Sequence, residues 1–367
     1  MIVKKAFPQQ TGLLASPTRR TVLKAGAAMT GVVLGAPLAR AQDKPKVIVR
    51  SLGGAYDAAM KKALHTPFTE ATGIDVVLQT ASAGQVRAMV QSGRGGIDVV
   101  DIGLPSMVAF DADGILEPVA YDKMTFTNPA DIYDAMRKPN YVGSLYFATV
   151  MVYNTQVYSA DKHPRSWAEF WDLKTWPGAR TIASQSAGSV PLEFAMLAAG
   201  KPMDHIYPID LDQGFASLSK VKPGVVKWWD TGAISAQLLE RKEAVLGAIW
   251  NGRAQDLIDK GAPLAIEWNQ ARREVQGLGV VKGAHNAANA QKFIDFALQP
   301  KVQAELTKHI AYGPTNKSAL ALVAPADAAK LPSEAEHYKN SFDMDYAWWQ
   351  ANLAEVGKRW QSWVLQG

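Results

Sequence analysis

The chain has 367 residues; 48% are hydrophobic and none is cysteine, which excludes disulfide bonds, thiol nucleophiles and thiolate metal sites. The formal net charge is +5 at pH 7, but residues 1–41 contain six basic side chains and no acidic one. Residues 42–367 therefore carry 33 basic and 34 acidic side chains, a net charge of −1, which gives no indication of a nucleic-acid or anionic-membrane partner. These 326 residues can bury a large core, and their number predicts two domains.

Residues 1–41 have the pattern of an export signal. A twin-arginine pattern at 18–24 is followed by a mildly apolar run at 25–38 and by an Ala-Arg-Ala cleavage site at 39–41. A membrane anchor is the alternative, but this run of 14 residues, rich in Gly and Ala, is shorter than the roughly 20 apolar residues of a spanning helix. We therefore expect a cleaved, twin-arginine-type signal and a periplasmic mature protein.

After the signal, short apolar strands alternate with helical patterns, as is typical of a parallel α/β sheet. The strands are expected at 47–49, 74–78 and 98–102, and the helices that follow them end at Ala71, span 84–92 and begin at Pro105. In open parallel sheets ligands bind at the carboxyl ends of the strands. The turns that follow these strands are therefore candidate ligand contacts.

Two of these turns carry suitable residues. Gly53 and Gly54 precede Tyr56, and two glycines between a strand and a helix let the backbone approach a ligand closely. An ordinary turn is the alternative, because the third glycine of a dinucleotide-binding fingerprint is absent. The third strand leads into Gly103 and Ser106, which we expect at the same edge of the sheet.

A fourth strand is expected near the middle of the chain. Residues 145–152 are apolar except for Thr149 and rich in β-branched and aromatic side chains, which predicts a strand buried on both faces. Strand–helix units precede it, and a similar series follows it with different turn residues. We interpret it as a strand crossing between two α/β lobes, whose crevice is where small molecules usually bind.

The second half of the chain continues the alternation. Strands are expected at 180–183, 245–249 and 275–281, the last crossing back, and helices at 166–171, 190–199, 253–260, 287–298, 301–310 and 345–365. The polar loop with Ser186 and Ser189 leads into a helix, which suits an anion, although a capped helix without a ligand is the alternative. Trp250 ends a strand, where a large aromatic side chain is more often core than site.

Seven motifs occur in order along the chain. They are Thr72-Gly73-Ile74, Asp98-Val99-Val100, Asp113-Gly114-Ile115-Leu116-Glu117-Pro118, Val152-Tyr153-Asn154-Thr155, Ser166-Trp167-x-x-Phe170-Trp171, Ile249-Trp250-Asn251-Gly252 and Tyr312-Gly313-Pro314-Thr315-Asn316. Their order and spacing resemble the solute-binding proteins of ABC importers, in particular the branch of the spermidine/putrescine-binding proteins.

The resemblance implies two α/β lobes, interleaved in sequence and joined by crossing strands. The first lobe would contain residues 42–149 and 277–331, and the second residues 150–276 and 332–367. A small-molecule ligand would lie in the cleft, with Tyr312 of the last motif among its contacts. The closed form, a monomer without cofactor or metal, would dock onto an inner-membrane ABC permease.

The nature of the ligand follows in part from the same resemblance. Polyamine-binding members hold ammonium groups with acidic side chains and methylene groups with aromatic rings. Tyr56 and Trp250 match two of the aromatic positions. Ser186, Ser189 and Leu278 stand where those proteins carry carboxylates. A buried ammonium group would then lack the opposite charge that offsets its desolvation.

The chain offers arginines in place of those acids. Arg253, Arg272 and Arg273 suit a carboxylate, although solvated surface positions are the alternative for each of them. The sequence therefore favours a small carboxylate or a zwitterion such as an ω-amino acid. Polyamine binding is the alternative, and in that case Asp101 and Glu267 would be the first acids to test.

An exported hydrolase or lyase is the rival class of function. The six histidines are far apart and show no metal-binding spacing, and no Gly-x-Ser-x-Gly element occurs. The sequence Asp111-x-Asp113-Gly114 lacks the later ligands of a calcium loop and is interpreted as a polar turn. Catalytic residues can converge from distant positions, so turnover of a bound compound would favour this class over a binding protein.

Overall fold

The computed structural model describes residues 44–366, and the predicted export signal at 1–41 lies outside them. The strands are β1 (Lys46–Arg50), β2 (Asp75–Gln79), β3 (Val99–Gly103), β4 (Leu116–Glu117), β5 (Val142–Asn154), β6 (Arg180–Ala183), β7 (Val225–Trp229), β8 (Leu246–Trp250), β9 (Leu264–Val281), β10 (Gly313–Pro314) and β11 (Ser341–Asp343). Over the described range, no helix combines the length and apolarity needed to cross a membrane.

The predicted α-helices are present, but the helices at 211–221, 232–240, 325–328 and 335–339 were not predicted from the sequence. They are α1 (Gly54–Met60), α2 (Thr66–Thr72), α3 (Ala83–Gln91), α4 (Leu104–Ala112), α5 (Trp167–Trp171), α6 (Leu192–Ala198), α7 (Leu211–Val221), α8 (Gly232–Glu240), α9 (Asn251–Asp259), α10 (Ala287–Ala297), α11 (Pro300–Thr307), α12 (Pro325–Ala328), α13 (Ala335–Lys339) and α14 (Tyr346–Leu365). The first predicted helix is interrupted by a π-helical segment at Lys61–His65 between α1 and α2.

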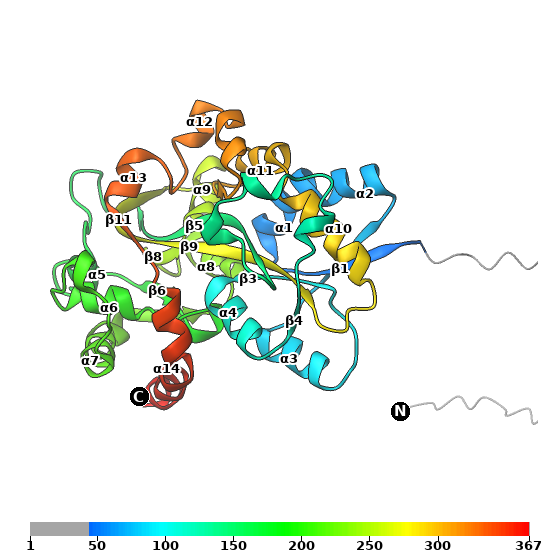
Figure 1. Ribbon diagram of the computed structural model, residues 1–367. Helices are drawn as coiled ribbons and strands as arrows, with labels where there is room; N and C mark the ends of the chain where they lie inside the picture. Colours follow the sequence, from blue (N-terminus) through cyan, green and yellow to red (C-terminus); the bar gives the residue numbers. More distant parts are fainter. Residues whose placement is uncertain (1–43, 367) are drawn as a thin grey trace, which may run out of the picture. The chain divides into compact units, whose positions relative to one another are not determined.

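The strands of the described residues form one sheet whose main path is β2-β1-β3-β9-β5-β8-β6-β7 (Figure 1). β1 is parallel to β2 and β3, and β6 is parallel to β7 and β8. We call these two ends of the sheet the first lobe and the second lobe. β5 and β9 run antiparallel between them, so the predicted two-lobed α/β architecture with crossing strands is confirmed.

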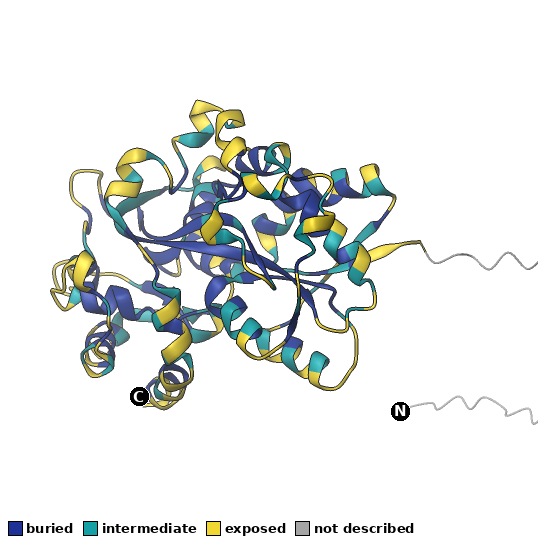
Figure 2. Cartoon of the chain, viewed as in Figure 1, coloured by how far each residue is buried: buried dark blue, intermediate teal, exposed yellow. Residues whose placement is uncertain are grey.

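Separate apolar clusters stabilise the two lobes. In the first lobe Phe68 and Phe293 belong to one cluster and Phe110 to another, while Trp167 and Trp229 belong to two clusters of the second lobe. Figure 2 shows the dark, buried strands between helices whose outer faces are exposed. The apolar stripes of these helices therefore cover the sheet, as expected for amphipathic helices.

The closing helix α14 packs on the second lobe, as the resemblance implied. Its Trp349, Trp360 and Trp363 belong to the same cluster as Trp167. The helix begins at an Asp345 cap, whose side chain accepts a hydrogen bond from the backbone N–H of Trp348 at 2.9 Å. The predicted bounds of 345–365 are therefore confirmed to within one residue.

The second crossing strand is longer than predicted. β9 begins at Leu264, whereas the sequence pattern predicts a strand only from Val275. The early part contains Arg272 and Glu274, which are charged but buried. The sequence of this part therefore lacks the apolar pattern of a core strand. They are accommodated because they pair with each other at 3.2 Å and with other buried polar groups.

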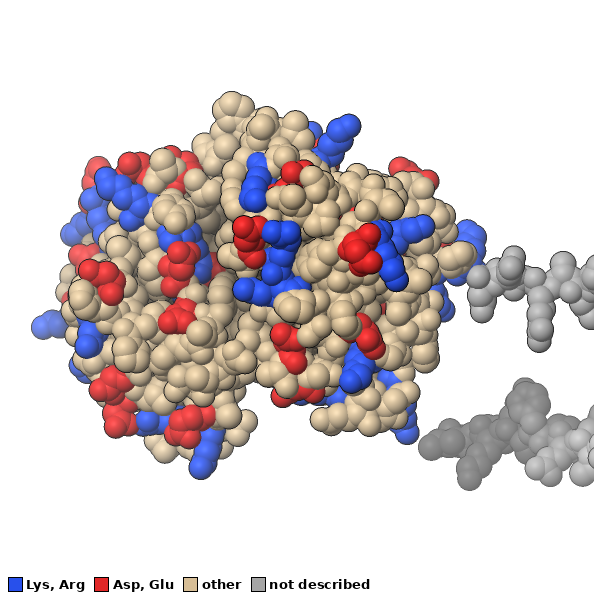
Figure 3. Space-filling model, viewed as in Figure 1, with Lys and Arg blue, Asp and Glu red and all other residues tan. Residues whose placement is uncertain are grey.

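Charges of both signs are distributed over the surface. On the face drawn in Figure 3, Lys and Arg side chains alternate with Asp and Glu side chains. Several form exposed pairs, such as Lys308 with Glu305 at 2.7 Å. Such pairs contribute at most about 1 kcal/mol each, so the fold rests on its apolar clusters.

Candidate functional site

A pocket lies where the first lobe, the second lobe and both crossing strands meet. It is narrow in this structure, with a cavity volume of about 20 Å³. Its lining residues are Leu52, Tyr56, Leu145, Phe147, Trp250, Arg253, Gln276 and Tyr312. Tyr56 and Trp250 come from segments that follow parallel strands, β1 and β8, so the pocket lies at the predicted carboxyl edge.

Aromatic rings form most of the pocket wall. Trp250 packs edge-on against Phe147, with ring centroids 5.8 Å apart and an interplanar angle of 79°. The ring of Tyr312 lies 5.8 Å from Phe147 and 6.1 Å from Tyr56. A Cβ atom at Gly252 would lie only 2.5 Å from the Tyr312 ring, so glycine at the start of α9 makes room for this wall.

Arg253 brings a buried positive charge to the pocket. Its side chain is 2% exposed and extends from the first turn of α9 toward the first lobe. Nη1 donates a hydrogen bond to the carbonyl oxygen of Gly53 at 2.9 Å, whereas Nε has no partner among residues 44–366. Nη2 donates to the carbonyl oxygen of Leu52 at 3.5 Å, and the guanidinium carbon lies 5.9 Å from the centroid of the Tyr56 ring. No acidic side chain of that range forms an ion pair with Arg253, so its charge has dipolar and aromatic partners but no anionic one.

The two glycines after β1 make room for the contact with Arg253. Gly53 and Gly54 have φ values of 71° and 58°, in the left-handed region that glycine tolerates best. A Cβ atom at Gly54 would lie 3.0 Å from Nη1 of Arg253. The predicted close approach at this turn is therefore made by an arginine of the second lobe.

Behind the wall, Asp101 is buried in the middle of β3, with 2% of its surface exposed. Its carboxylate accepts hydrogen bonds from the Tyr56 hydroxyl and from Nε2 of Gln276, each at 2.7 Å. Burial raises the pKa of Asp101 to about 6, although both hydrogen bonds act to lower it. The pKa of Tyr56 is raised well above its ordinary value by burial and by Asp101, so the tyrosine keeps its proton.

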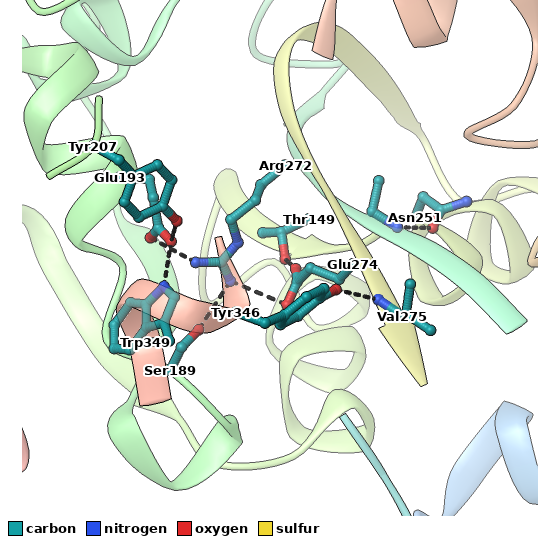
Figure 4. Close-up of polar contacts among 11 residues, drawn as sticks. Thr149, Ser189, Glu193, Tyr207, Asn251, Arg272, Glu274, Val275, Tyr346 and Trp349 are labelled. Atoms are coloured by element: carbon teal, nitrogen blue, oxygen red, sulfur yellow. Dashed lines mark hydrogen bonds and ion pairs between the residues drawn. The ribbon is translucent and has the colours of Figure 1, made fainter. Parts of the chain in front are cut away.

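Arg272 and Ser189 lie together in a different buried network (Figure 4). Arg272 pairs with Glu193 at 2.7 Å and with Glu274 at 3.2 Å, and it donates to the Ser189 hydroxyl at 3.0 Å. Burial lowers the pKa of Arg272, but Glu193 and Glu274 raise it above its ordinary value. The positive charge of Arg272 is therefore compensated within the protein, and Arg272 does not line the pocket.

The same network saturates Glu193. Its Oε1 accepts hydrogen bonds from the Tyr207 hydroxyl and from the indole N–H of Trp349, each at 2.6 Å (Figure 4). Glu274 in turn accepts from the Thr149 hydroxyl at 2.5 Å. These contacts connect α6, α14 and both crossing strands. The network therefore stabilises the fold and does not line the pocket.

The other predicted site residues lie outside the pocket lining. Ser186 is exposed, and its N–H donates to the Ser184 hydroxyl at 3.1 Å. Gly103 and Ser106 lie at the start of α4. Arg273 pairs with Asp343 at 2.8 Å, away from the pocket.

One of the two acids considered from the sequence, Glu267, and Leu278, which stands at a carboxylate position of the polyamine-binding relatives, also lie elsewhere. Glu267 hydrogen-bonds His163 at 3.1 Å, and Leu278 is an apolar core residue of the first lobe. Of the predicted residues, the structure thus brings together Gly53, Gly54, Tyr56, Trp250, Arg253 and Tyr312.

Four lining residues were not identified from the sequence. Leu52 adjoins the glycine turn, whereas Leu145 and Phe147 alternate on one face of the predicted crossing strand. Gln276 is a single polar residue between Val275 and Gly277 in the other crossing strand. A polar side chain inside an otherwise apolar strand is the feature of the sequence from which Gln276 could have been predicted as a site residue.

Residues 63–333 match the family model described as "Bacterial extracellular solute-binding protein". A relative named "Gamma-aminobutyric acid-binding protein", from Pseudomonas aeruginosa, is 31% identical over 338 residues, which are 90% of this chain and 94% of the relative. These matches confirm the resemblance noted from the motifs.

Two solved structures bear on the arrangement of the lobes. The binding protein AgtB of Agrobacterium tumefaciens, in complex with agropinic acid, is 31% identical with a TM-score of 0.81, over 88% of this chain and 99% of that one. AttC of Agrobacterium tumefaciens, in an open unliganded conformation, is 29% identical with a TM-score of 0.60, over 88% and 100%. At almost equal identity, the TM-score is thus higher against the liganded AgtB structure than against the open AttC structure.

Proposed function

The chain belongs to the bacterial extracellular solute-binding proteins, and from this premise we propose that it is the periplasmic solute-binding component of an ABC importer. We propose as its ligand a small zwitterion of the ω-amino acid class. The proposal includes the cleaved twin-arginine-type signal at 1–41, a monomeric mature form and delivery to an inner-membrane permease. It also includes the lobe boundaries expected from the sequence. The first lobe contains residues 42–149 and 277–331, and the second lobe contains residues 150–276 and 332–367.

The single observation that carries the choice of ligand is the state of Arg253. A guanidinium group that is 2% exposed, unpaired with any acid of the described range and with a free Nε is costly to bury. A ligand carboxylate in the pocket would supply the missing opposite charge. A diamine would instead place a second positive charge beside Arg253, which argues against polyamines.

The walls of the pocket support a ligand with methylene groups and a cationic end. Aromatic rings such as Tyr56, Phe147 and Trp250 cover methylene groups and attract a cation to their faces. The printed name of the Pseudomonas aeruginosa relative agrees with a ligand of this class.

Closure about the crossing strands is the proposed mechanism of capture. Arg253 of the second lobe reaches Gly53 of the first lobe, so separation of the lobes would break this contact and open the pocket. Hinge closure around a ligand is a known motion of periplasmic binding proteins, and the permease would recognise the closed form. Small-angle scattering should show compaction of the unliganded protein when ligand is added, and an unchanged radius at saturation would refute the hinge.

A matched four-carbon series tests the proposed ligand class. Titration calorimetry of the mature protein should show one-to-one binding of 4-aminobutyrate, weaker binding of butyrate and little or no heat from putrescine. Tight binding of putrescine without binding of 4-aminobutyrate would establish the polyamine alternative. Chemical conversion of a bound compound would instead support the hydrolase or lyase class.

A further inference from the structure

Asp101 does not line the pocket itself, but it contacts two residues that do. Its Oδ2 accepts the proton of the Tyr56 hydroxyl, and its Oδ1 accepts from Nε2 of Gln276, each at 2.7 Å. Three elements are thereby joined, because Asp101 is in the middle of β3, Tyr56 is on α1 and Gln276 is on β9.

An ionised carboxylate can only accept hydrogen bonds, so it fixes the direction of both contacts. The single proton of the Tyr56 hydroxyl is directed to Asp101, which leaves only lone pairs of Oη for other partners. The amide of Gln276 must turn its NH₂ group to Asp101, which leaves the carbonyl oxygen Oε1 as the free end. Oε1 lies beside Gly103, where a Cβ atom would be 3.9 Å away, and Gln276 uses only its Nε2 in the contact with Asp101.

We propose that Asp101 is a specificity-determining positioning residue, which uses the donors of Tyr56 and Gln276 so that this end of the pocket offers only acceptors. This inference rests on the proposed function, because it assigns the ammonium end of the ω-amino acid. Arg253 is the opposite case, since a guanidinium group has donors and no acceptor. The pocket thus combines the donors of Arg253, whose guanidinium carbon lies 5.9 Å from the centroid of the Tyr56 ring, with the acceptors of Tyr56 and Gln276.

The polarity discriminates between ligands of equal length. A zwitterion can direct its carboxylate to Arg253 and its ammonium group to Tyr56 Oη and Gln276 Oε1. A monocarboxylate leaves those two acceptors without donors, and a dicarboxylate directs a second acceptor at them, which costs affinity. The buried charge of Asp101 adds a through-space preference for a cation at this end.

The charge of Asp101 depends on groups that face it from the neighbouring elements. Arg50 on β1 donates from Nη1 to the Asp101 carbonyl oxygen at 2.8 Å and lowers the pKa of the carboxyl group, while Asp57 on α1 raises it. Burial is the largest influence and raises that pKa to about 6. Once protonated, Asp101 must donate its own proton to Tyr56 or Gln276, and one acceptor of the pocket is lost.

The Asp101→Asn variant tests this role, because an asparagine amide must donate to one of the two residues. In wild type, calorimetry should show 4-aminobutyrate binding more tightly than butyrate, with the preference decreasing between pH 7 and pH 5. In Asp101→Asn the affinity for 4-aminobutyrate should fall about tenfold to a hundredfold. The affinity for butyrate should remain nearly unchanged, and the preference should no longer depend on pH in this interval.

Asp98→Asn is the matched control. Asp98 is also 2% exposed, but it accepts from the backbone N–H of Ile48 at 2.7 Å and from Asn286, neither of which lines the pocket. Its replacement should lower the melting temperature without changing the ratio of the two affinities.

The outcomes separate the two proposals. If wild type binds neither 4-aminobutyrate nor butyrate, the proposed function fails and this inference fails with it. If wild type prefers 4-aminobutyrate but Asp101→Asn, folded by circular dichroism, keeps the wild-type ratio and pH profile, only the role of Asp101 is refuted. An equal loss of both affinities in Asp101→Asn would also refute it, because this is the result of a structural role alone.

Discussion

Replacement of Arg253 should separate ligand affinity from protein stability. Arg253→Met retains most of the side-chain volume and removes the guanidinium group. A ligand carboxylate would then lie buried without an opposite charge, which costs about 2–5 kcal/mol. The dissociation constant of 4-aminobutyrate should therefore rise about thirtyfold or more.

The structure predicts a different result for the unliganded variant. Wild-type Arg253 is 2% exposed, has no acidic partner in the described range and leaves its Nε unpaired, so its burial is only partly compensated. Loss of its bond to the Gly53 carbonyl acts in the opposite direction. We expect the melting temperature of unliganded Arg253→Met to stay close to that of wild type.

Calorimetry and thermal melting measure these two effects. Ligand at a hundred times its dissociation constant stabilises wild type by about 2.7 kcal/mol, and this increment should fall below about 1 kcal/mol in Arg253→Met at the same concentration. Arg273→Met is the control, because Arg273 is also buried but pairs with Asp343 away from the pocket. Binding of 4-aminobutyrate by Arg253→Met within about threefold of wild type would refute the assignment of Arg253 to the carboxylate.

Arg272→Met should destabilise the protein by about 3–5 kcal/mol in urea denaturation, because it leaves Glu193 buried without its cation; the double variant with Glu193→Gln should recover part of the loss. Gly54→Ala should weaken ligand binding, because the new Cβ atom would lie 3.0 Å from Nη1 of Arg253. Gly73 also has a positive φ, but a Cβ atom there would have no neighbour within 4 Å, so Gly73→Ala should lower only the stability. His65 has a pKa that burial lowers to about 4, so it is neutral in the fold and gains a proton on unfolding. The contribution of His65 to the free energy of unfolding should therefore decrease by about 3 kcal/mol as the pH falls from 6.5 to 4. Urea denaturation of a His65→Leu variant measures this, and a pH dependence equal to that of wild type would contradict the prediction.

The sequence by itself determined most of the strands and helices and the crossing strand at 145–152, but α7, β7 and α8 were not predicted; β7 is mostly not buried and lacks the pattern of a buried strand. Buried strands and amphipathic helices leave a periodic pattern in neighbouring residues, and this pattern is local. It also located the edge of the sheet that holds Tyr56 and Trp250, because both follow predicted parallel strands. It did not extend β9 back to Leu264, since buried charged residues interrupt the apolar pattern there.

Only the tertiary structure decided which of the three arginines is available to a ligand. Arg272 meets Glu193, 79 residues away, and Arg273 meets Asp343, 70 residues away, whereas Arg253 meets no acid of the described range. No spacing rule in the sequence distinguishes these three side chains. The compensation of a charge depends on distance in space, and the pairing of β9 with distant segments sets that distance.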